Sequence, residues 1–307
     1  MTGILFIVGS SRSGSTLLER LLNELPGVVS VGELQRVWRR GFVENQLCSC
    51  GQPFHDCAFW GEVRGRLADG GDFDAAAADA LSRRVYKVRM HRRVTTDDRS
   101  AFRGYWRRLF EAIAEVSDAR WLVDSSKTPE HAARLASLEG FDTRYLHLVR
   151  DPRAVAFSKM RRRLRPEIHW MESYMATRSA GASASSWNAT QRLTESLRRQ
   201  IDRPWMRLRY EDLAAEPHRA LITLSETLGL PVADDAFAFL SGHRARVQVG
   251  HSVSGNPMRF QHGDLRIAAD DEWRRAMPWR TRFEVELRCW RGLRRYGYTG
   301  NGGRSAG

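Results

Sequence analysis

The chain has almost no lysine: three of its 49 basic residues are lysines, at Lys87, Lys127 and Lys159, and the others are arginines. It also has only four cysteines in 307 residues, so it does not depend on a disulfide framework. No apolar run approaches the roughly 18 to 20 residues of a transmembrane helix. The first expected strand starts near residue 3, which leaves no room for a signal peptide. These absences predict a cytoplasmic globular protein without a transmembrane segment.

Charge of one sign dominates, because the formal net charge at pH 7 is +13. Such an excess favours anionic partners, namely nucleotides, acidic glycans, nucleic acid or an anionic membrane surface. The basic residues are spread along the chain, and no DNA-binding or RNA-binding motif accompanies them. We therefore expect no nucleic-acid partner, while a peripheral membrane contact and the oligomeric state stay open.

Short apolar runs alternate with helical periodicity along the chain. Strands are expected at 4–8, 120–124, 143–149 and 205–210, and helices at 15–25, 100–116, 129–139, 152–163, 217–228 and 280–295. This alternation predicts an α/β fold with a central parallel sheet flanked by helices. Ligands of such folds bind at the carboxyl ends of the strands. We expect one domain over 1–298, a cysteine-bearing insert at about 46–58, a mobile loop at 178–187 and a flexible tail at 299–307.

The first strand leads into the segment "GSSRSGST" at 9–16. A nucleotide-triphosphate loop reads G-x-x-x-x-G-K-[ST], and here Ser15 replaces the lysine, with Arg12 as the nearest cation. Gly14 allows a sharp turn, and the following amides and hydroxyls of Ser13, Ser15 and Thr16 face a helix N-terminus where an anion is stabilised. The segment predicts an anion site, and an ordinary turn with a serine cap is the alternative.

A second strand–turn–helix occurs in "YLHLVRDPRAVAFSKM" at 145–160. Arg150 ends the expected strand, Asp151 has the place of an N-cap and Pro152 is the first helical residue. Arg150 at this edge of the sheet could bind a phosphate through two hydrogen bonds. An arginine paired with a carboxylate at a capped helix start is the structural alternative.

Together these segments resemble the sulfotransferases that use 3′-phosphoadenosine 5′-phosphosulfate (PAPS), which have a P-loop-like α/β fold. "SRSGST" at 11–16 is similar to the family loop that holds the 5′-phosphosulfate, which implies cofactor contacts for Arg12, Ser13, Gly14, Ser15 and Thr16. An arginine followed eight residues later by a serine holds the 3′-phosphate in the family, and Arg150 and Ser158 have that spacing. PAPS is thus the implied cofactor, with 3′-phosphoadenosine 5′-phosphate as product.

Further motifs extend the resemblance to about residue 228. "RYEDL" at 209–213 resembles a segment whose tyrosine, here Tyr210, lies near the adenine. "VDSSKTPEH" at 123–131 resembles the family's lysine-bearing strand end, so Lys127 is implied to contact the sulfonate. The family's C-terminal phosphate segment has no clear counterpart, and Arg259 in "HSVSGNPMRF" is a candidate for it. The "GE" at 32–33 is similar to bacterial and tyrosylprotein-type members, and Glu33 resembles their carboxylate base.

The resemblance implies metal-independent, in-line transfer of a sulfuryl group to a hydroxyl or amine of a small-molecule, lipid or glycan acceptor. Lys127 and Arg12 would neutralise charge on the bridging oxygen, and Glu33 would be the general base. His131, His169 and His55 are alternative bases. Asp124 and Ser126 flank Lys127 and are expected to orient it. Two other functions stay open: a kinase-like phosphotransferase using ATP and magnesium, and a non-catalytic nucleotide-binding protein.

The segment "CSCGQPFHDC" at 48–57 holds three cysteines and a histidine. Cys48, Cys50, His55 and Cys57 could bind zinc, although C-x-C is not the usual C-x₂-C spacing. A disulfide from Cys57 to Cys48 or Cys50 and a simple packed loop are the alternatives. We expect no catalytic thiol here.

Overall fold

A five-stranded parallel sheet forms the centre of the computed structural model, which describes residues 1–69, 71, 73–88, 94–136, 138–230, 233 and 235–299. Its strands are β1 (Gly3–Gly9), β2 (Val28–Gly32), β3 (Trp121–Lys127), β4 (Asp142–Val149) and β5 (Trp205–Arg209), in the spatial order β2-β3-β1-β4-β5. A second, antiparallel sheet contains β6 (Leu240–Ser241), β7 (Arg244–Val247) and β8 (Gly263–Arg266). The expectation of an α/β fold with a parallel sheet is thus confirmed.

Helices connect and cover these strands. The α-helices are α1 (Ser15–Leu22), α2 (Ala58–Asp69), α3 (Ala75–Lys87), α4 (Thr96–Ser117), α5 (Pro129–Leu135), α6 (Pro152–Met160), α7 (Ala180–Gln200), α8 (Tyr210–Ala215), α9 (Pro217–Leu228), α10 (Trp273–Ala276) and α11 (Trp279–Arg295). A short 3-10 turn η1 (Leu34–Arg36) and a π-helical segment η2 (Val37–Val43) follow β2, and a 3-10 turn η3 (Pro257–Phe260) precedes β8.

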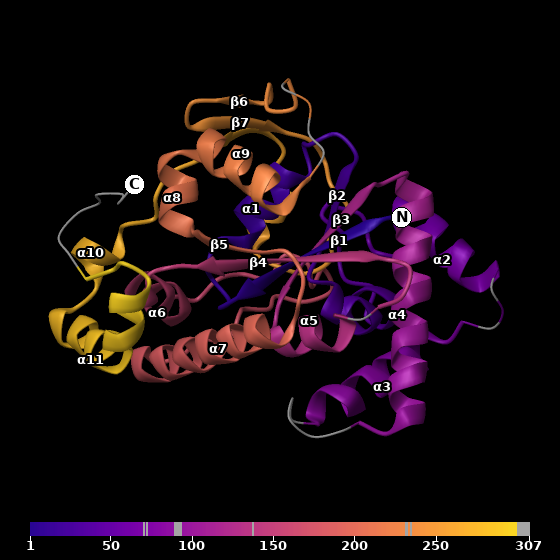
Figure 1. Ribbon diagram of the computed structural model, residues 1–307, viewed down its shortest axis with the longest axis horizontal. Coiled ribbons are helices and arrows are strands. Elements are labelled where there is room, and N and C mark those ends of the chain that lie inside the picture. Colours follow the sequence, from indigo (N-terminus) through magenta and orange to yellow (C-terminus); the bar gives the residue numbers. More distant parts are fainter. Residues whose placement is uncertain are drawn as a thin grey trace.

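The middle strand β1 is buried on both faces, which explains its unbroken apolar sequence. Its even residues Ile4, Phe6 and Val8 pack into an aromatic-rich core with α2 to α5, whereas Leu5 and Ile7 pack against α1, α8 and α9. Figure 1 shows these layers, with α1, α8 and α9 on one side of the sheet and α5, α6, α7 and α11 on the other.

Four of the described α-helices, α3, α4, α6 and α7, begin with a side-chain cap. Thr95 Oγ1 accepts from the amide of Asp98 at 3.2 Å before α4, and Asp151 Oδ1 accepts from the amide of Arg153 at 2.8 Å before α6. Helix α1, by contrast, has Gly14 as its N-cap residue and no side-chain cap. The first-turn amides of α1 are therefore not bound by a capping side chain, and this end of the helix lies at the carboxyl edge of the sheet.

The expected mobile loop at 178–187 is wrong, because residues from Ala180 onward form α7, with Ser179 as its N-cap. Ala180, Gly181 and Ala184 are buried, and their small size allows a close approach of α11: a Cβ added to Gly181 would lie 2.3 Å from Glu284 Oε1. Residues 300–307 of the expected tail lie outside the described part of the chain. Among the described residues, no helix is long and apolar enough to cross a membrane.

Candidate functional site

All five strands of the parallel sheet deliver a candidate functional residue at their carboxyl ends. Glu33 follows β2, Lys127 ends β3, the loop 10–14 follows β1, Arg150 follows β4 and Tyr210 follows β5. Given the strand order, this is also their order across the sheet edge. The strand edge therefore carries a carboxylate and a lysine at one end, an arginine and a tyrosine at the other, and the glycine-rich loop between them.

The loop after β1 is held in a turn that exposes the N-terminus of α1. Ser13 Oγ donates to the carbonyl oxygen of Ser10 at 2.7 Å. Arg12 and Gly14 have positive φ angles of 71° and 90°, conformations in which glycine is favoured. A Cβ on Gly14 would lie 2.3 Å from the ring of Tyr210, so the glycine also permits the close approach of this ring. Uncapped amides and the positive end of a helix dipole are features that favour an anion at this position.

Arg150 lies beside this loop and is only 6% exposed. Its Nη1 donates to the carbonyl oxygen of Arg12 at 3.1 Å, and its Nη2 donates to Asp270 Oδ2 at 2.9 Å. The guanidinium also lies 4.3 Å from the centre of the Tyr210 ring. Its Nε is buried and has no hydrogen-bond partner in the described part of the chain. A buried donor without a partner is costly, and a bound oxyanion would satisfy it.

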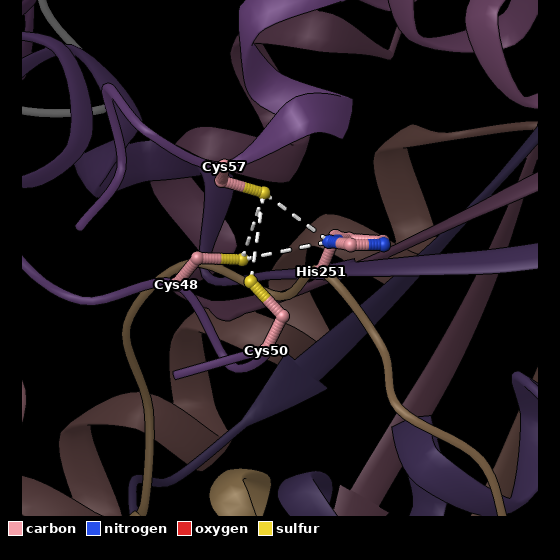
Figure 2. A group of neighbouring side chains, drawn as sticks. All are labelled: Cys48, Cys50, Cys57 and His251. Carbon is pink, nitrogen blue, oxygen red and sulfur yellow. Dashed lines mark hydrogen bonds between the residues drawn. The ribbon is translucent and has the colours of Figure 1, made fainter. Parts of the chain in front are cut away.

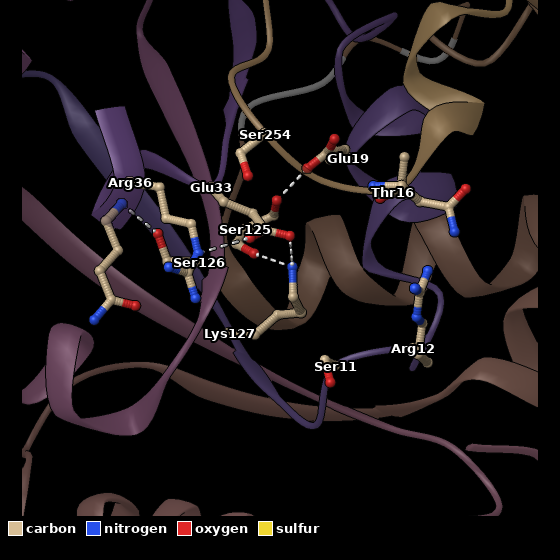
Figure 3. Close-up of polar contacts among 12 residues, drawn as sticks. Ser11, Arg12, Thr16, Glu19, Glu33, Arg36, Ser125, Ser126, Lys127 and Ser254 are labelled. Atoms are coloured by element: carbon tan, nitrogen blue, oxygen red, sulfur yellow. Dashed lines mark hydrogen bonds and ion pairs between the residues drawn. The ribbon is translucent and has the colours of Figure 1, made fainter. Parts of the chain in front are cut away.

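At the other end of the sheet edge, Lys127 and Glu33 form an ion pair. Lys127 Nζ donates to Glu33 Oε1 at 2.6 Å and to the carbonyl oxygen of Ser125 at 2.9 Å (Figure 3). Both side chains are largely buried, with 11% and 17% exposed. Arg36 Nε lies 3.7 Å from the other carboxylate oxygen, Glu33 Oε2. The second oxygen of Glu33 thus has the weaker partner.

The charges around Glu33 decide its protonation. Burial alone would raise the pKa of Glu33, but the charge and hydrogen bond of Lys127, followed by Arg40 and Arg36, lower this pKa below its usual value. Glu33 is therefore ionised at neutral pH.

The basic side chains around the cavity repel one another. Burial, followed by the charge of Arg36, lowers the pKa of Arg40 to about 10. Burial, followed by the charges of Arg178 and Arg12, lowers the pKa of Lys159 to about 8. Burial is the main cause of both shifts, the neighbouring positive charges add to it, and a bound anion would offset those charges.

These groups line one cavity of about 640 Å³, a volume in the usual range of small-molecule sites. Its cationic lining comprises Arg12, Arg36, Arg40, Lys127, Arg150, Lys159, Arg163, Arg165, Arg178 and Arg266, and its acidic lining comprises Glu33, Glu167 and Asp270. Ser15, Thr16, Ser158 and Tyr210 line it as well. The cavity is thus strongly basic, which suits a ligand with several negative charges.

The sequence candidate Arg259 is placed elsewhere. It is 3% exposed, does not belong to the cavity lining, and donates to the carbonyl oxygens of Ser252 at 2.6 Å and Leu47 at 2.8 Å. Its described contacts tie two loops together.

The three histidines considered as bases also lie outside the lining. His131 is 1% exposed and bonds Asp124 Oδ2 at 2.7 Å and the Tyr86 hydroxyl at 2.6 Å. His55 and His169 contact the carbonyl oxygens of Phe42 and Asn45 at 2.9 and 3.2 Å. Asp124 therefore orients His131 and Ser126 rather than Lys127. Among the described lining residues, Glu33 is the carboxylate that pairs with Lys127.

Several lining residues were not found from the sequence. Asp270 bonds Arg150, Glu167 bonds Arg165 at 2.9 Å, and the Met175 sulfur accepts a hydrogen bond from Arg12. They lie in irregular segments without a strand–turn–helix pattern, so no local signal marks them.

The fold and the cavity are those of an α/β protein with a glycine-rich loop and a basic cavity at the carboxyl edge of its parallel sheet. The chain matches the model of the Sulfotransferase family over residues 5–234 and belongs to that family. It is also similar to the sulfotransferase domain from the Synechococcus PCC 7002 olefin synthase, at 24% identity and a TM-score of 0.50, covering 94% of this chain and 95% of that one.

A further similar structure is the sulfotransferase domain from the curacin biosynthetic pathway, at 22% identity and a TM-score of 0.55, covering 95% and 97%. These two likenesses establish the fold. No curated protein sequence matches the chain.

Proposed function

We propose that this protein transfers a sulfuryl group from PAPS to a hydroxyl or amine of a small-molecule, lipid or glycan acceptor. The observation that carries this proposal is the order along the sheet edge. Arg150 and Tyr210 lie on one side of the uncapped loop, and the Lys127–Glu33 pair lies on the other. A nucleotide can thus lie across the edge, with its transferable group facing the lysine and the carboxylate.

The residues present fit the nucleotide. The free first-turn amides of α1, with the hydroxyls of Ser15 and Thr16, suit the 5′-phosphosulfate. The partnerless Nε of Arg150, together with Ser158, suits the 3′-phosphate. Tyr210 adds an aromatic face for the adenine.

When bound, PAPS supplies an activated sulfuryl group on a phosphate leaving group. Lys127 Nζ holds a positive charge at the sulfonate end of the cavity, and Arg12 adds a second from the loop. Ionised Glu33 accepts the proton of the acceptor at Oε2, since Oε1 is occupied by Lys127. The carboxylate base and the lack of a histidine in the described lining favour the branch that resembles tyrosylprotein sulfotransferases.

Magnesium-dependent phosphoryl transfer from ATP is less well supported. Ser15 stands where the triphosphate-binding lysine is needed. Asp124 on β3, the counterpart of a magnesium-holding aspartate, is 1% exposed and is used by Ser126 and His131.

We also propose that residues 1–298 act as one domain in the cytoplasm. One cavity is lined both by the loop after β1 and by residues 255–270, which supports a single unit. All four cysteines lie in the described part of the chain and are unpaired, which fits a reducing compartment.

The test is calorimetric titration with adenosine 3′,5′-bisphosphate without magnesium, beside ATP with magnesium. We expect tight binding of the bisphosphate. In Arg150→Ala the binding free energy should weaken by roughly 2 to 4 kcal/mol, because a desolvated charge contact is removed. Arg219→Ala, at an exposed arginine on α9, is the matched control. Binding of ATP with magnesium, and none of the bisphosphate, would overturn the proposal.

A further inference from the structure

Three cysteines and one histidine meet outside the cavity. Cys48, Cys50 and Cys57 come from the loop between η2 and α2, and His251 comes from the segment after β7, nearly 200 residues later. Figure 2 shows the three sulfur atoms and the imidazole converging on one point. Their four ligand atoms all lie within 4.8 Å of one another, and Cys48 and Cys57 are buried.

Four of the six distances between ligand atoms are close to the edges of a zinc tetrahedron, and the other two are no longer than 4.8 Å. Cys57 Sγ lies 3.6 Å from both Cys48 Sγ and Cys50 Sγ, and His251 Nδ1 lies 3.3 Å from Cys57 Sγ and 3.8 Å from Cys48 Sγ. With bonds of about 2.3 Å to sulfur and 2.0 to 2.1 Å to nitrogen, tetrahedral zinc needs ligand separations of roughly 3.8 and 3.6 Å. A disulfide needs about 2.05 Å between its sulfurs, and all four cysteines are unpaired.

We propose that Cys48, Cys50 and Cys57 through Sγ and His251 through Nδ1 bind one zinc ion in a closed, four-coordinate structural site. Three thiolates and one imidazole are soft and borderline ligands that favour zinc over magnesium or calcium. With all four positions taken by the protein, the ion has a structural role and no open position for a reaction.

The surrounding contacts hold the ligands in place. Ser49 and Ser252 are joined twice, through the amide of Ser49 to the carbonyl oxygen of Ser252 at 3.2 Å and the amide of Ser252 to Ser49 Oγ at 2.7 Å. Trp60 Nε1 donates to the carbonyl oxygen of His251 at 2.8 Å, and the Phe59 ring stacks on the imidazole at 4.9 Å. Such outer contacts fix the orientation of a ligating imidazole.

The site fastens a segment that reaches the cavity. Two residues after His251, the carbonyl oxygen of Val253 accepts from the amide of Glu33 at 2.8 Å, and Ser254 Oγ accepts from Arg40. The amide of Asn256 lies 3.4 Å from Thr16 Oγ1. Zinc would thus hold the wall of the cavity next to Glu33, at a distance from the transferred group.

His55 is the histidine that the sequence offers as the fourth ligand, because it lies within the cysteine segment. In the structure its Nε2 instead contacts the carbonyl oxygen of Phe42 at 2.9 Å, and His251 joins the three cysteines. His251→Ala and His55→Ala therefore form a matched pair, and Cys57→Ser pairs with Cys289→Ser, at a buried cysteine on α11. Metal content of the purified proteins is measured by mass spectrometry. We expect about one zinc per chain in the wild type, His55→Ala and Cys289→Ser, and a loss of at least about tenfold in His251→Ala and Cys57→Ser.

The wild-type protein alone gives a second test, should these variants fail to fold. Replacement of the metal by Co²⁺ should give the visible bands of tetrahedral cobalt and the near-ultraviolet absorption of cobalt thiolates. Chelation should lower the melting temperature, and added zinc should restore it. Three results would each overturn the proposal. The first is a protein without bound metal whose four cysteines all titrate as free thiols, and the second is a loss of two titratable thiols in the absence of reductant, which would indicate a disulfide. The third is zinc retained in His251→Ala.

Discussion

At the residue scale, Lys127 has a backbone conformation that lysine rarely adopts. Its φ is 69°, which costs of order 1 to 3 kcal/mol and persists only where the surroundings enforce it. The ladder between β1 and β3 shifts register before the pair of Val8 and Lys127. The strand end is thereby turned so that Nζ reaches Glu33. Backbone strain at this position agrees with a role of the lysine in transfer rather than in folding.

Lys127→Met should lower the rate constant of sulfuryl transfer by roughly 10²- to 10³-fold, the usual effect of removing one positioned donor. The affinity for adenosine 3′,5′-bisphosphate should change far less, because Arg150 and the loop remain. Single-turnover conversion of PAPS, with an acceptor found by screening hydroxyl and amine compounds, measures the rate. Lys87→Met, at an exposed lysine on α3, is the control, and equal rates in the two variants would contradict the role of Lys127.

A second residue-scale prediction concerns Glu19, a buried carboxyl on α1. Burial raises its pKa to about 7, against the lowering effect of the hydrogen bond from Ser125. The folded protein therefore binds a proton that the unfolded chain releases near pH 4.5, and this contribution to stability is lost as pH rises through 7. From pH 5 to 8 the unfolding free energy should fall by up to roughly 3 kcal/mol through this group.

Glu19→Gln should remove this part of the pH dependence, as measured by urea unfolding at both pH values. Glu139→Gln, at an exposed glutamate, should leave the dependence unchanged. An identical pH profile in Glu19→Gln and the wild type would show that Glu19 is not protonated in the folded state.

At the scale of elements, the sequence predicts the strands and helices that have a local pattern of apolar residues or caps. β1 and the buried stretches of β3 and β4 are apolar because strands covered on both faces need no polar side, whereas the edge strand β5 is only partly buried. Helix α6 begins as its Asp151-Pro152 pair predicts. The start of α7 is not recognised from the sequence because its residues before Trp187 are small and polar. The candidate residues on strand ends were found, whereas Asp270 and His251 were not. Asp270 contacts Arg150 and His251 contacts Cys57, each more than 100 residues away in the sequence, and no local pattern encodes such a pairing.

Gly14→Ala tests the loop that leads into α1. The added methyl would meet both a positive φ and the Tyr210 ring, whereas Gly140→Ala has a similar φ of 85° with nothing within 4 Å of the new Cβ. Both variants should lose stability through backbone strain, by roughly 1 kcal/mol or more. Only Gly14→Ala should also lose at least roughly tenfold in bisphosphate affinity, which calorimetry measures. Equal affinities would mean that the loop does not hold the nucleotide.

At the scale of the whole molecule, the cavity joins distant parts of the chain. Arg150 links the loop after β1 to Asp270, and Asn256 approaches Thr16 on α1. A ligand in this cavity contacts segments that otherwise belong to different layers of the fold. Binding should therefore stabilise the molecule as a unit.

Adenosine 3′,5′-bisphosphate at about 100 times its dissociation constant should add roughly 2.7 kcal/mol of stability, which raises the melting temperature by roughly 5 °C for a chain of this size. Differential scanning calorimetry measures this shift. Arg150→Ala should show less than half of it at the same concentration, and Arg219→Ala the whole of it. A full shift in Arg150→Ala would place the bound phosphates elsewhere.

The central position of β1 has a consequence for synthesis on the ribosome. β1 is made first, yet both its hydrogen-bonding partners, β3 and β4, follow more than 100 residues later. At roughly 5 to 20 residues per second, this apolar strand waits roughly 5 to 30 s with both edges open. Open strand edges invite pairing with other chains. During this interval the strand is open to pairing with other chains, and crowded overproduction should favour aggregates that form through β1.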